Sequence, residues 1–148
     1  MKRYLLLIMT TVLCLSVHAQ QKKEKYSKEE FQAKQEAYIT KQAGLTAEEA
    51  SKFFPIYYEL KKKKKEINNL AWKNAKKGKE PQTTEKEYED ILNGFIVAEE
   101  QNNALDKEYL KKYQKVLSNK KIYMVLRAEI KFHRNMLKIL QEQPTPKK

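Results

Sequence analysis

Three segments of this chain begin with the same local pattern, a serine or threonine followed three positions later by a glutamate. The pairs are Ser27 with Glu30, Thr46 with Glu49, and Thr84 with Glu87. In such a pair the hydroxyl and the carboxylate each accept a hydrogen bond from a backbone N–H group that the first helical turn leaves without a partner. The pattern therefore predicts three helices that begin near residues 28, 47 and 85.

The ends of these helices are predicted from a small number of glycines and prolines, three and four in 148 residues. Gly44 is expected to end the first helix in a left-handed conformation, and Gly78 with Pro81 to form the turn before the third. Pro55 lies inside the second predicted helix, where it removes one backbone hydrogen bond. Because the apolar positions continue on one side of it, we expect a single kinked helix to about Lys77.

Apolar residues recur every three or four positions through the rest of the chain, as in amphipathic helices. Gly94, inside the third predicted helix, is expected to mark a close contact with another helix. A fourth helix is expected to begin at Leu117 and Ser118, and one of its faces carries Ile122, Leu126, Ile130, His133, Leu137 and Leu140. We expect an all-α fold, an elongated four-helix hairpin arrangement with two long antiparallel helices.

The N-terminal segment predicts export from the cytoplasm. Positive charges at Lys2 and Arg3 precede an apolar run, and small residues follow at Val17 and Ala19. This is the pattern of a secretory signal peptide cleaved after Ala19, and the run is too short for a comfortable membrane span. We therefore expect residues 1–19 to be a signal peptide, 20–142 a single helical domain, and 143–148 a disordered tail.

The mature chain would have few residues able to support catalysis or metal binding. Cys14 and His18 lie in the signal segment, which leaves His133 as the only histidine and no cysteine. His133 and Glu129 could share a helix face, but two ligands are fewer than a closed zinc site needs. A partly buried histidine beside a carboxylate is the favoured interpretation. We expect no catalytic residue, no metal and no cofactor, and hence no enzyme.

Five consecutive lysines, at positions 61 to 65, raise the question of nucleic-acid binding. Residues 61–79 contain nine lysines and one glutamate, whereas residues 80–105 contain seven acidic residues and one lysine. If these segments form an antiparallel hairpin centred near residue 81, facing positions sum to about 162. The predicted pairs are then Lys62 with Glu100, Lys63 with Glu99, and Lys73 with Glu89. This charge pattern favours helix pairing, and no motif for nucleic-acid recognition accompanies it.

The uncompensated positive charge lies later, in residues 106–148, with twelve basic and four acidic residues. Phe53 and Tyr57 are predicted to be core residues, while Phe54 and Tyr58 are placed on a second interface, either a dimer contact or a binding face. The candidate binding residues are Phe54, Tyr58, Lys111, Lys112, Lys115, Arg127, Lys131 and Arg134.

Two segments resemble the Spy/CpxP family of periplasmic chaperones, which is known for a repeated LTxxQ motif. They are LTAEEASKFFPIYYELKKKKKEI and KVLSNKKIYMVLRAEIKFHRNMLKIL. Glu49 and Lys121 stand where the family motif has glutamine. Glu49 can still cap a helix, but Lys121 cannot accept that hydrogen bond. The motif positions in this chain are Leu45, Thr46, Glu49, Leu117, Ser118 and Lys121.

The resemblance implies an ATP-independent chaperone or envelope-stress accessory of the periplasm. Members of the Spy/CpxP family form antiparallel, cradle-shaped homodimers with a basic, partly apolar concave face. A protein of this kind would bind unfolded or misfolded envelope proteins on that face, or would regulate a membrane sensor without chaperone activity. The alternative from the residues alone is a basic surface binder of lipopolysaccharide or anionic lipid.

Overall fold

The computed structural model describes residues 27–142, so the predicted signal peptide and the predicted tail at 143–148 lie outside the described residues. The chain divides into two units, Met1–Phe31 and Gln32–Lys148. In the described part of the first unit, the Ser27 N–H donates to Glu30 Oε2 at 2.8 Å and the Glu30 N–H donates to Ser27 Oγ at 3.1 Å. The predicted capping pair is therefore present.

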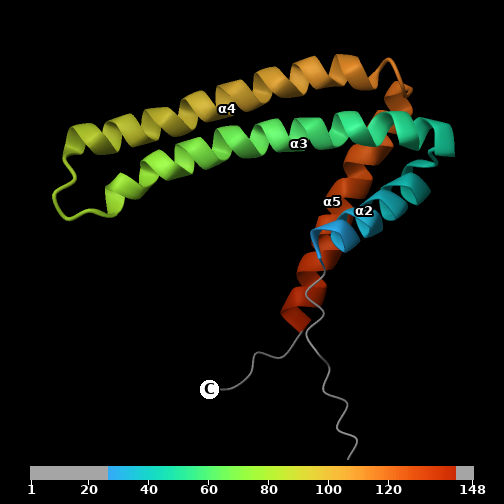
Figure 1. Cartoon of the computed structure of the whole chain (residues 1–148), viewed down its shortest axis with the longest axis horizontal. Helices are drawn as coiled ribbons and strands as arrows, with labels where there is room; N and C mark the ends of the chain where they lie inside the picture. The colour runs from blue at the N-terminus through green and yellow to red at the C-terminus, as the bar shows by residue number, and fades with distance from the viewer. Residues whose placement is uncertain (1–26, 143–148) are drawn as a thin grey trace, which may run out of the picture. The chain divides into compact units, whose positions relative to one another are not determined.

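Four α-helices and no strand make up the regular structure of residues 27–142 (Figure 1). The helices are α2 (Lys28–Ala43), α3 (Ala47–Ala75), α4 (Glu85–Tyr113) and α5 (Asn119–Glu142), with a 3₁₀ turn, η2 (Lys76–Lys79), after α3. Both predicted threonine–glutamate capping boxes are formed, at the starts of α3 and α4. Gly44 ends α2 with a φ of 62°. The all-α prediction and the predicted helix starts are confirmed.

Helix α3 continues through Pro55 as one 29-residue helix. Its buried positions lie on both sides of the proline, because Phe53 precedes it and Leu60 follows it. The last residues before the turn adopt the tighter 3₁₀ form, which begins at Lys76. The prediction of one helix instead of two short ones is therefore confirmed.

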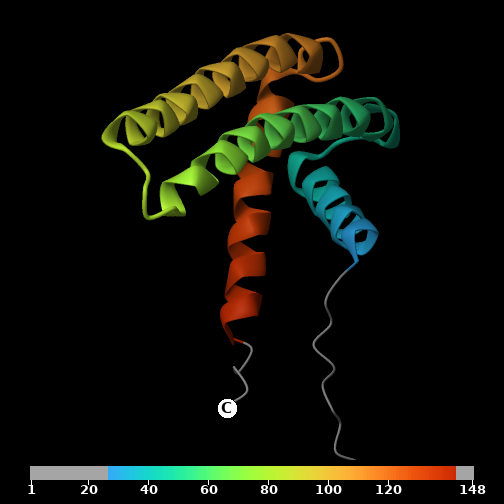
Figure 2. The same cartoon turned by 60° about the vertical axis from the view of Figure 1, so that its left-hand side comes forward.

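Helices α3 and α4 lie side by side and antiparallel (Figures 1 and 2). Asn102 Nδ2 donates to Asn68 Oδ1 at 2.8 Å, and Lys64 Nζ lies 2.7 Å from Asp106 Oδ2. These facing positions sum to 170, so the predicted pairs of Lys62 with Glu100, Lys63 with Glu99 and Lys73 with Glu89 are wrong. The difference of eight positions displaces α4 by about 12 Å along the hairpin.

The turn explains this displacement. Tyr88 Oη donates to the carbonyl oxygen of Gly78 at 3.2 Å, so the first turn of α4 lies against η2. A Cβ atom on Gly78 would lie 3.3 Å from side-chain atoms of both Ile91 and Tyr88, whereas a Cβ on Gly94 would meet nothing within 4 Å. The close helix contact predicted at Gly94 is therefore wrong, since the contact is at Gly78.

The core lies at the end of the hairpin where α2 and α5 meet α3. Phe53 and Tyr109 are completely buried there, and the Phe53 and Tyr113 ring centroids are 4.8 Å apart. Toward the turn only two helices pack together, and large apolar side chains stay exposed there, among them Leu70, Trp72, Leu92 and Ile96. The hairpin therefore extends beyond its core.

Helix α5 runs across α3 instead of along it (Figure 2). Its buried side chains are Ile122, Val125, Ala128 and Phe132. Of the residues expected along one face of this helix, Ile122 is buried, but Leu126, Ile130 and Leu137 are 49%, 60% and 59% exposed. This face is only partly buried, because a crossing helix is covered by its partner only near the crossing point.

Candidate functional site

The two motif segments meet at the edge of the core through a pair of partly exposed charged side chains. Glu49 is in the first turn of α3 and Lys121 in the first turn of α5. Lys121 Nζ lies 2.7 Å from Glu49 Oε1 and 2.5 Å from Glu49 Oε2. Next to them Leu45 and Leu117 are buried. The two positions where the family motif has glutamine thus carry opposite charges that bind one another.

This pair also takes part in helix capping. Glu49 Oε2 accepts a hydrogen bond from the Thr46 N–H at 2.8 Å, and the hydroxyl of Ser118 accepts one from the Lys121 N–H at 3.3 Å. The hydrogen bond from Lys121, followed by that from the Thr46 backbone, holds the pKa of the Glu49 carboxyl below its ordinary value. Lys121 therefore stabilises the start of α3, an effect that the sequence analysis missed because the partner is 72 residues away.

The aromatic side chains between positions 53 and 58 of α3 form one cluster. Helix α2 packs against the side of this cluster that carries Phe54 and Tyr58. Phe54 is only 6% exposed, and its ring packs on Phe53, Tyr57 and Tyr58. The Tyr58 hydroxyl is 3.5 Å from the backbone oxygen of Gln32 in α2. The second interface expected for Phe54 and Tyr58 thus lies within the chain in this structure. Both residues also line a groove of about 730 Å³ beside α2.

Three lysines of the run at positions 61–65 form ion pairs, each with a different acidic residue. Lys61 pairs with Glu129 on α5, Lys64 with Asp106 on α4, and Lys63 with Glu59 on its own helix at 3.3 Å. Lys62 and Lys65 are exposed. The run therefore joins α3 to two other helices.

The candidate basic residues form two groups. Lys111 and Lys112 lie in the last turn of α4, and Lys115 follows in the turn after it. Lys112 is engaged there, because its Nζ lies 2.9 Å from Glu108 Oε1 and 4.0 Å from the centre of the Tyr109 ring. The other group, on α5, surrounds a shallow hollow of about 500 Å³.

This α5 hollow combines positive charge with apolar surface. It is lined by Arg127, Lys131, Arg134 and Lys138, together with Met124 and Ile130 and others. Arg127 also lies over the Tyr123 ring, 5.8 Å from its centre. Along one side of the cations runs a stripe of exposed apolar side chains, Leu126, Ile130 and Leu137, which we call the open face of α5. The structure therefore brings three of the candidate binding residues together beside exposed apolar side chains.

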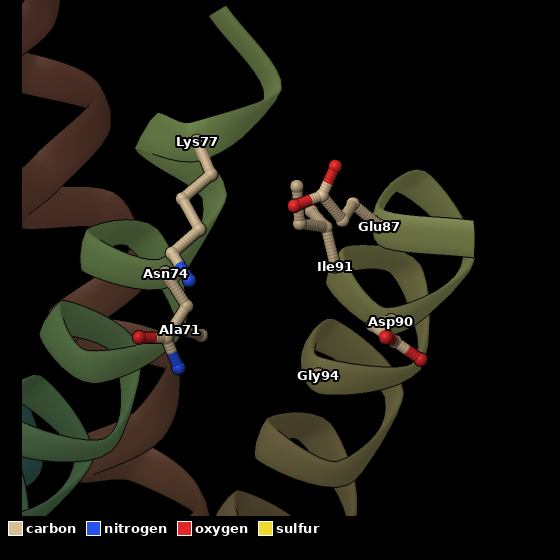
Figure 3. A pocket seen from close by; sticks show the side chains of 7 residues that line it. All are labelled: Ala71, Asn74, Lys77, Glu87, Asp90, Ile91 and Gly94. Atoms are coloured by element: carbon tan, nitrogen blue, oxygen red, sulfur yellow. The ribbon is translucent and has the colours of Figure 1, made fainter. Parts of the chain in front are cut away.

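A second hollow, of about 310 Å³, lies between α3 and α4 near the turn (Figure 3). Asn74 and Lys77 line one side and Glu87 and Ile91 the other (Figure 3). The Glu87 carboxylate is already bound to the backbone N–H of Thr84 at 2.8 Å. The backbone hydrogen bond from Thr84 is the main cause of its lowered pKa. This carboxylate is therefore part of a helix cap and not a free acid or base.

His133 belongs to a polar contact between α2 and α5. Its Nε2 lies 3.3 Å from Gln35 Nε2 and 3.7 Å from Glu129 Oε1. Across the described residues 27–142, no group of three His, Cys, Asp or Glu side chains is arranged to hold a metal ion. In the same range no helix combines the length and the apolar character needed to cross a bilayer.

Comparison of the chain with models of protein families, with curated proteins and with solved structures gave no match in any of the three.

Proposed function

We propose that the mature protein is an ATP-independent chaperone or envelope-stress accessory of the periplasm that binds unfolded proteins along α5. The observation that carries this proposal is the open face of α5 beside the cations of the α5 hollow. Contiguous apolar surface left exposed next to polar groups is typical of interaction sites. An unfolded protein exposes both apolar and acidic side chains, and α5 offers a partner for each.

The export signal and the motif resemblance support the same proposal. Both motif segments begin a helix with a buried leucine and a capping hydroxyl residue. Binding of this kind needs no nucleotide and no catalytic side chain, since the affinity comes from apolar contact and from charge.

We further propose that the protein acts as a homodimer joined at the turn end of the hairpin. Leu70, Trp72, Leu92 and Ile96 are exposed there. The α3 side of this end is strongly basic and the α4 side strongly acidic. A two-fold axis that places α3 of one copy against α4 of the other would pair opposite charges twice. It would also bury apolar surface that one copy leaves open.

Two matched double variants test the proposals separately. Ile130→Ser with Leu137→Ser changes the open face of α5, and Leu92→Ser with Ile96→Ser changes α4 at almost the same exposures. The mature protein should delay light scattering by a chemically unfolded client without ATP. We expect the α5 variant to lose most of this delay and to remain dimeric by sedimentation. The α4 variant should become monomeric and keep the delay per subunit.

Absence of any delay at several-fold molar excess of the wild-type protein would exclude the chaperone. The accessory role would survive that result and predicts binding to the periplasmic domain of a membrane sensor. Equal loss of activity in both double variants would contradict the assignment of the client surface to α5.

A second candidate function is binding to anionic lipid or lipopolysaccharide. It is favoured by α5 itself, because an apolar stripe flanked by Arg127, Lys131, Arg134 and Lys138 is the pattern of helices that lie in a membrane interface. Titration against phosphatidylglycerol and phosphatidylcholine vesicles at low and high salt tests it. Binding to the anionic vesicles alone, lost at high salt, would favour lipid over unfolded protein as the partner.

A further inference from the structure

The open face of α5 has a regular spacing that says more about its partner. Its exposed apolar side chains are Leu126, Ile130 and Leu137. His133, whose side chain is half exposed, continues the same line between Ile130 and Leu137. The four positions are separated by four, three and four residues. This is the heptad spacing with which one α-helix packs along another, and from Leu126 to Leu137 it extends for about 17 Å.

A second line of side chains, all of them cationic, runs parallel to the first. It repeats the same spacing one residue later, and its members are all exposed: Arg127, Lys131, Arg134 and Lys138. Because adjacent residues of a helix are about 100° apart, these cations follow one flank of the apolar line. The other flank is the side of α5 that packs into the protein, where Val125 and Phe132 are buried. The positive charge therefore lies on one side of the apolar line only.

These cations differ from the lysines of α3 in having no acidic partner in the fold. In the part of the chain that the structure describes, no ion pair includes any of the four. Lys61 and Lys64, by contrast, are paired with acids on other helices. Surfaces that bind one another carry complementary charge. The cationic line therefore fits a partner whose acidic side chains lie along one flank of its own apolar side chains.

The spacing favours a helix over an extended chain as this partner. Successive positions of the apolar line on α5 are about 6, 4.5 and 6 Å apart along the helix axis. The apolar side chains of a second heptad helix advance by the same alternation of four and three residues, so they stay in step with α5. In an extended chain the side chains of one face recur about every 6.6 Å. Over the length of the apolar line such a chain would be out of step by about 3 Å.

We propose that the open face of α5 binds an acidic amphipathic α-helix of its protein partner. The apolar side chains of that helix, at heptad spacing, pack on Leu126, Ile130 and Leu137. Its glutamates or aspartates, along one flank, face Arg127 and Arg134. Because this site is the client surface of the proposed function, it rests on that function, and it narrows the clients to segments that can form such a helix. A client segment of this kind folds into the helix as it binds.

The probes for the test are synthetic peptides of about 21 residues, the length of three heptads. The acidic heptad peptide has leucine at the two apolar positions of each heptad, glutamate at the two positions that flank them, and alanine or glutamine elsewhere. Its glutamates repel one another between two copies, which opposes self-association. The basic heptad peptide has lysine in place of each glutamate. The rearranged peptide has the composition of the acidic heptad peptide in an order without heptad spacing.

Each peptide carries a fluorescent label and is titrated with the mature protein, with anisotropy reporting binding and circular dichroism reporting helix. We expect the acidic heptad peptide to gain helix and to bind at least about tenfold more tightly than the basic or the rearranged peptide. Ile130→Ser with Leu137→Ser should weaken it by about tenfold or more.

Charge reversal locates the flank that the acids contact. Arg127→Glu with Arg134→Glu should bind the basic heptad peptide at least as tightly as the acidic one. The matched control is Lys111→Glu with Lys115→Glu, which makes the same change of charge at two exposed lysines near the end of α4. This control should keep the preference of the wild-type protein for the acidic heptad peptide.

Equal affinity of the wild-type protein for the acidic heptad peptide and the rearranged peptide would overturn the proposed helix site. A delay of light scattering by the same protein would then leave the proposed function intact. Tight binding of the acidic heptad peptide without any such delay would support the helix site and leave only the accessory role.

Three other results would overturn the proposed site. One is an unchanged preference for the acidic heptad peptide in Arg127→Glu with Arg134→Glu. Another is a change of oligomeric state in that variant by sedimentation, because a second copy would then cover the open face of α5. The third is binding of the wild-type protein to phosphatidylglycerol vesicles but to none of the peptides, which would assign the face to lipid.

Discussion

Alkaline pH should unfold this protein through two buried tyrosines. The pKa of the Tyr57 and Tyr113 hydroxyls is raised in the folded protein, first by burial and then by the Glu129 charge. In the unfolded chain these hydroxyls ionise near their ordinary pKa of 10.0. A raised folded pKa means that the stabilisation is complete below pH 10 and is lost as the pH rises from there toward the folded pKa.

The size of the effect follows from linkage between ionisation and folding. While both tyrosines stay neutral in the fold, each lowers the free energy of unfolding by about 1.4 kcal/mol per pH unit above pH 10. Together they lower it by about 2.8 kcal/mol per unit, or about 5.5 kcal/mol by pH 12. That is comparable with the whole stability of a small domain, about 5–15 kcal/mol.

The assay follows helix content by circular dichroism and tyrosinate by absorbance between pH 9 and 12.5. We expect a cooperative loss of helix at which the buried tyrosines ionise together. Tyr57→Phe with Tyr113→Phe should move the midpoint to higher pH, and Tyr123→Phe, at a position 58% exposed, should not. Loss of lysine charge is common to all variants and cancels. Equal midpoints for the wild-type protein and the double variant would refute the reasoning.

Four further substitutions test other parts of the fold. Phe53→Ala should lower the free energy of unfolding in urea by about 3–5 kcal/mol, because the ring is completely buried, and a loss below about 1 kcal/mol would contradict this. Gly94→Ala should raise the melting temperature, with a gain of about 1 kcal/mol, because its Cβ meets nothing, whereas Gly78→Ala should lower it because of the 3.3 Å contacts. Lys121→Ala should reduce the acid sensitivity of the urea midpoint. The lowered pKa of Glu49 stabilises the fold above its ordinary value of 4.5, and that stabilisation is lost as the pH falls through the folded value. Unchanged pH dependence in Lys121→Ala would count against the pair.

Features that depend on a few neighbouring residues were predictable. The capping boxes at Thr46 and Thr84 and the left-handed Gly44 are formed as expected, since each needs only a hydroxyl, a carboxylate or a missing Cβ within one turn of chain. The core positions of Phe53 and Tyr57 followed from helical spacing.

Features that depend on contacts between distant parts of the chain were not predictable from the sequence. The observed register of α3 and α4 differs from the predicted one by eight positions. The prediction assumed a turn centred near residue 81 and did not include the packing of Gly78 against Tyr88. Phe54 is buried by α2, whereas Leu126 stays exposed because α5 crosses α3. Helical spacing of apolar residues therefore did not decide which of them would be buried. The Glu49–Lys121 pair could have been suggested only by noticing that both stand at the same motif position with opposite charges.

By itself the sequence determined the helical class, the helix starts and the excess of positive charge after residue 106. These follow from local hydrogen bonding, from apolar spacing and from composition, which do not depend on the path of the chain. Only the tertiary structure decided which face of α5 stays open and that Tyr57 and Tyr113 both pack against Phe53. Those outcomes depend on the register of two long helices and on the direction of a third, and the register is set by contacts at the turn.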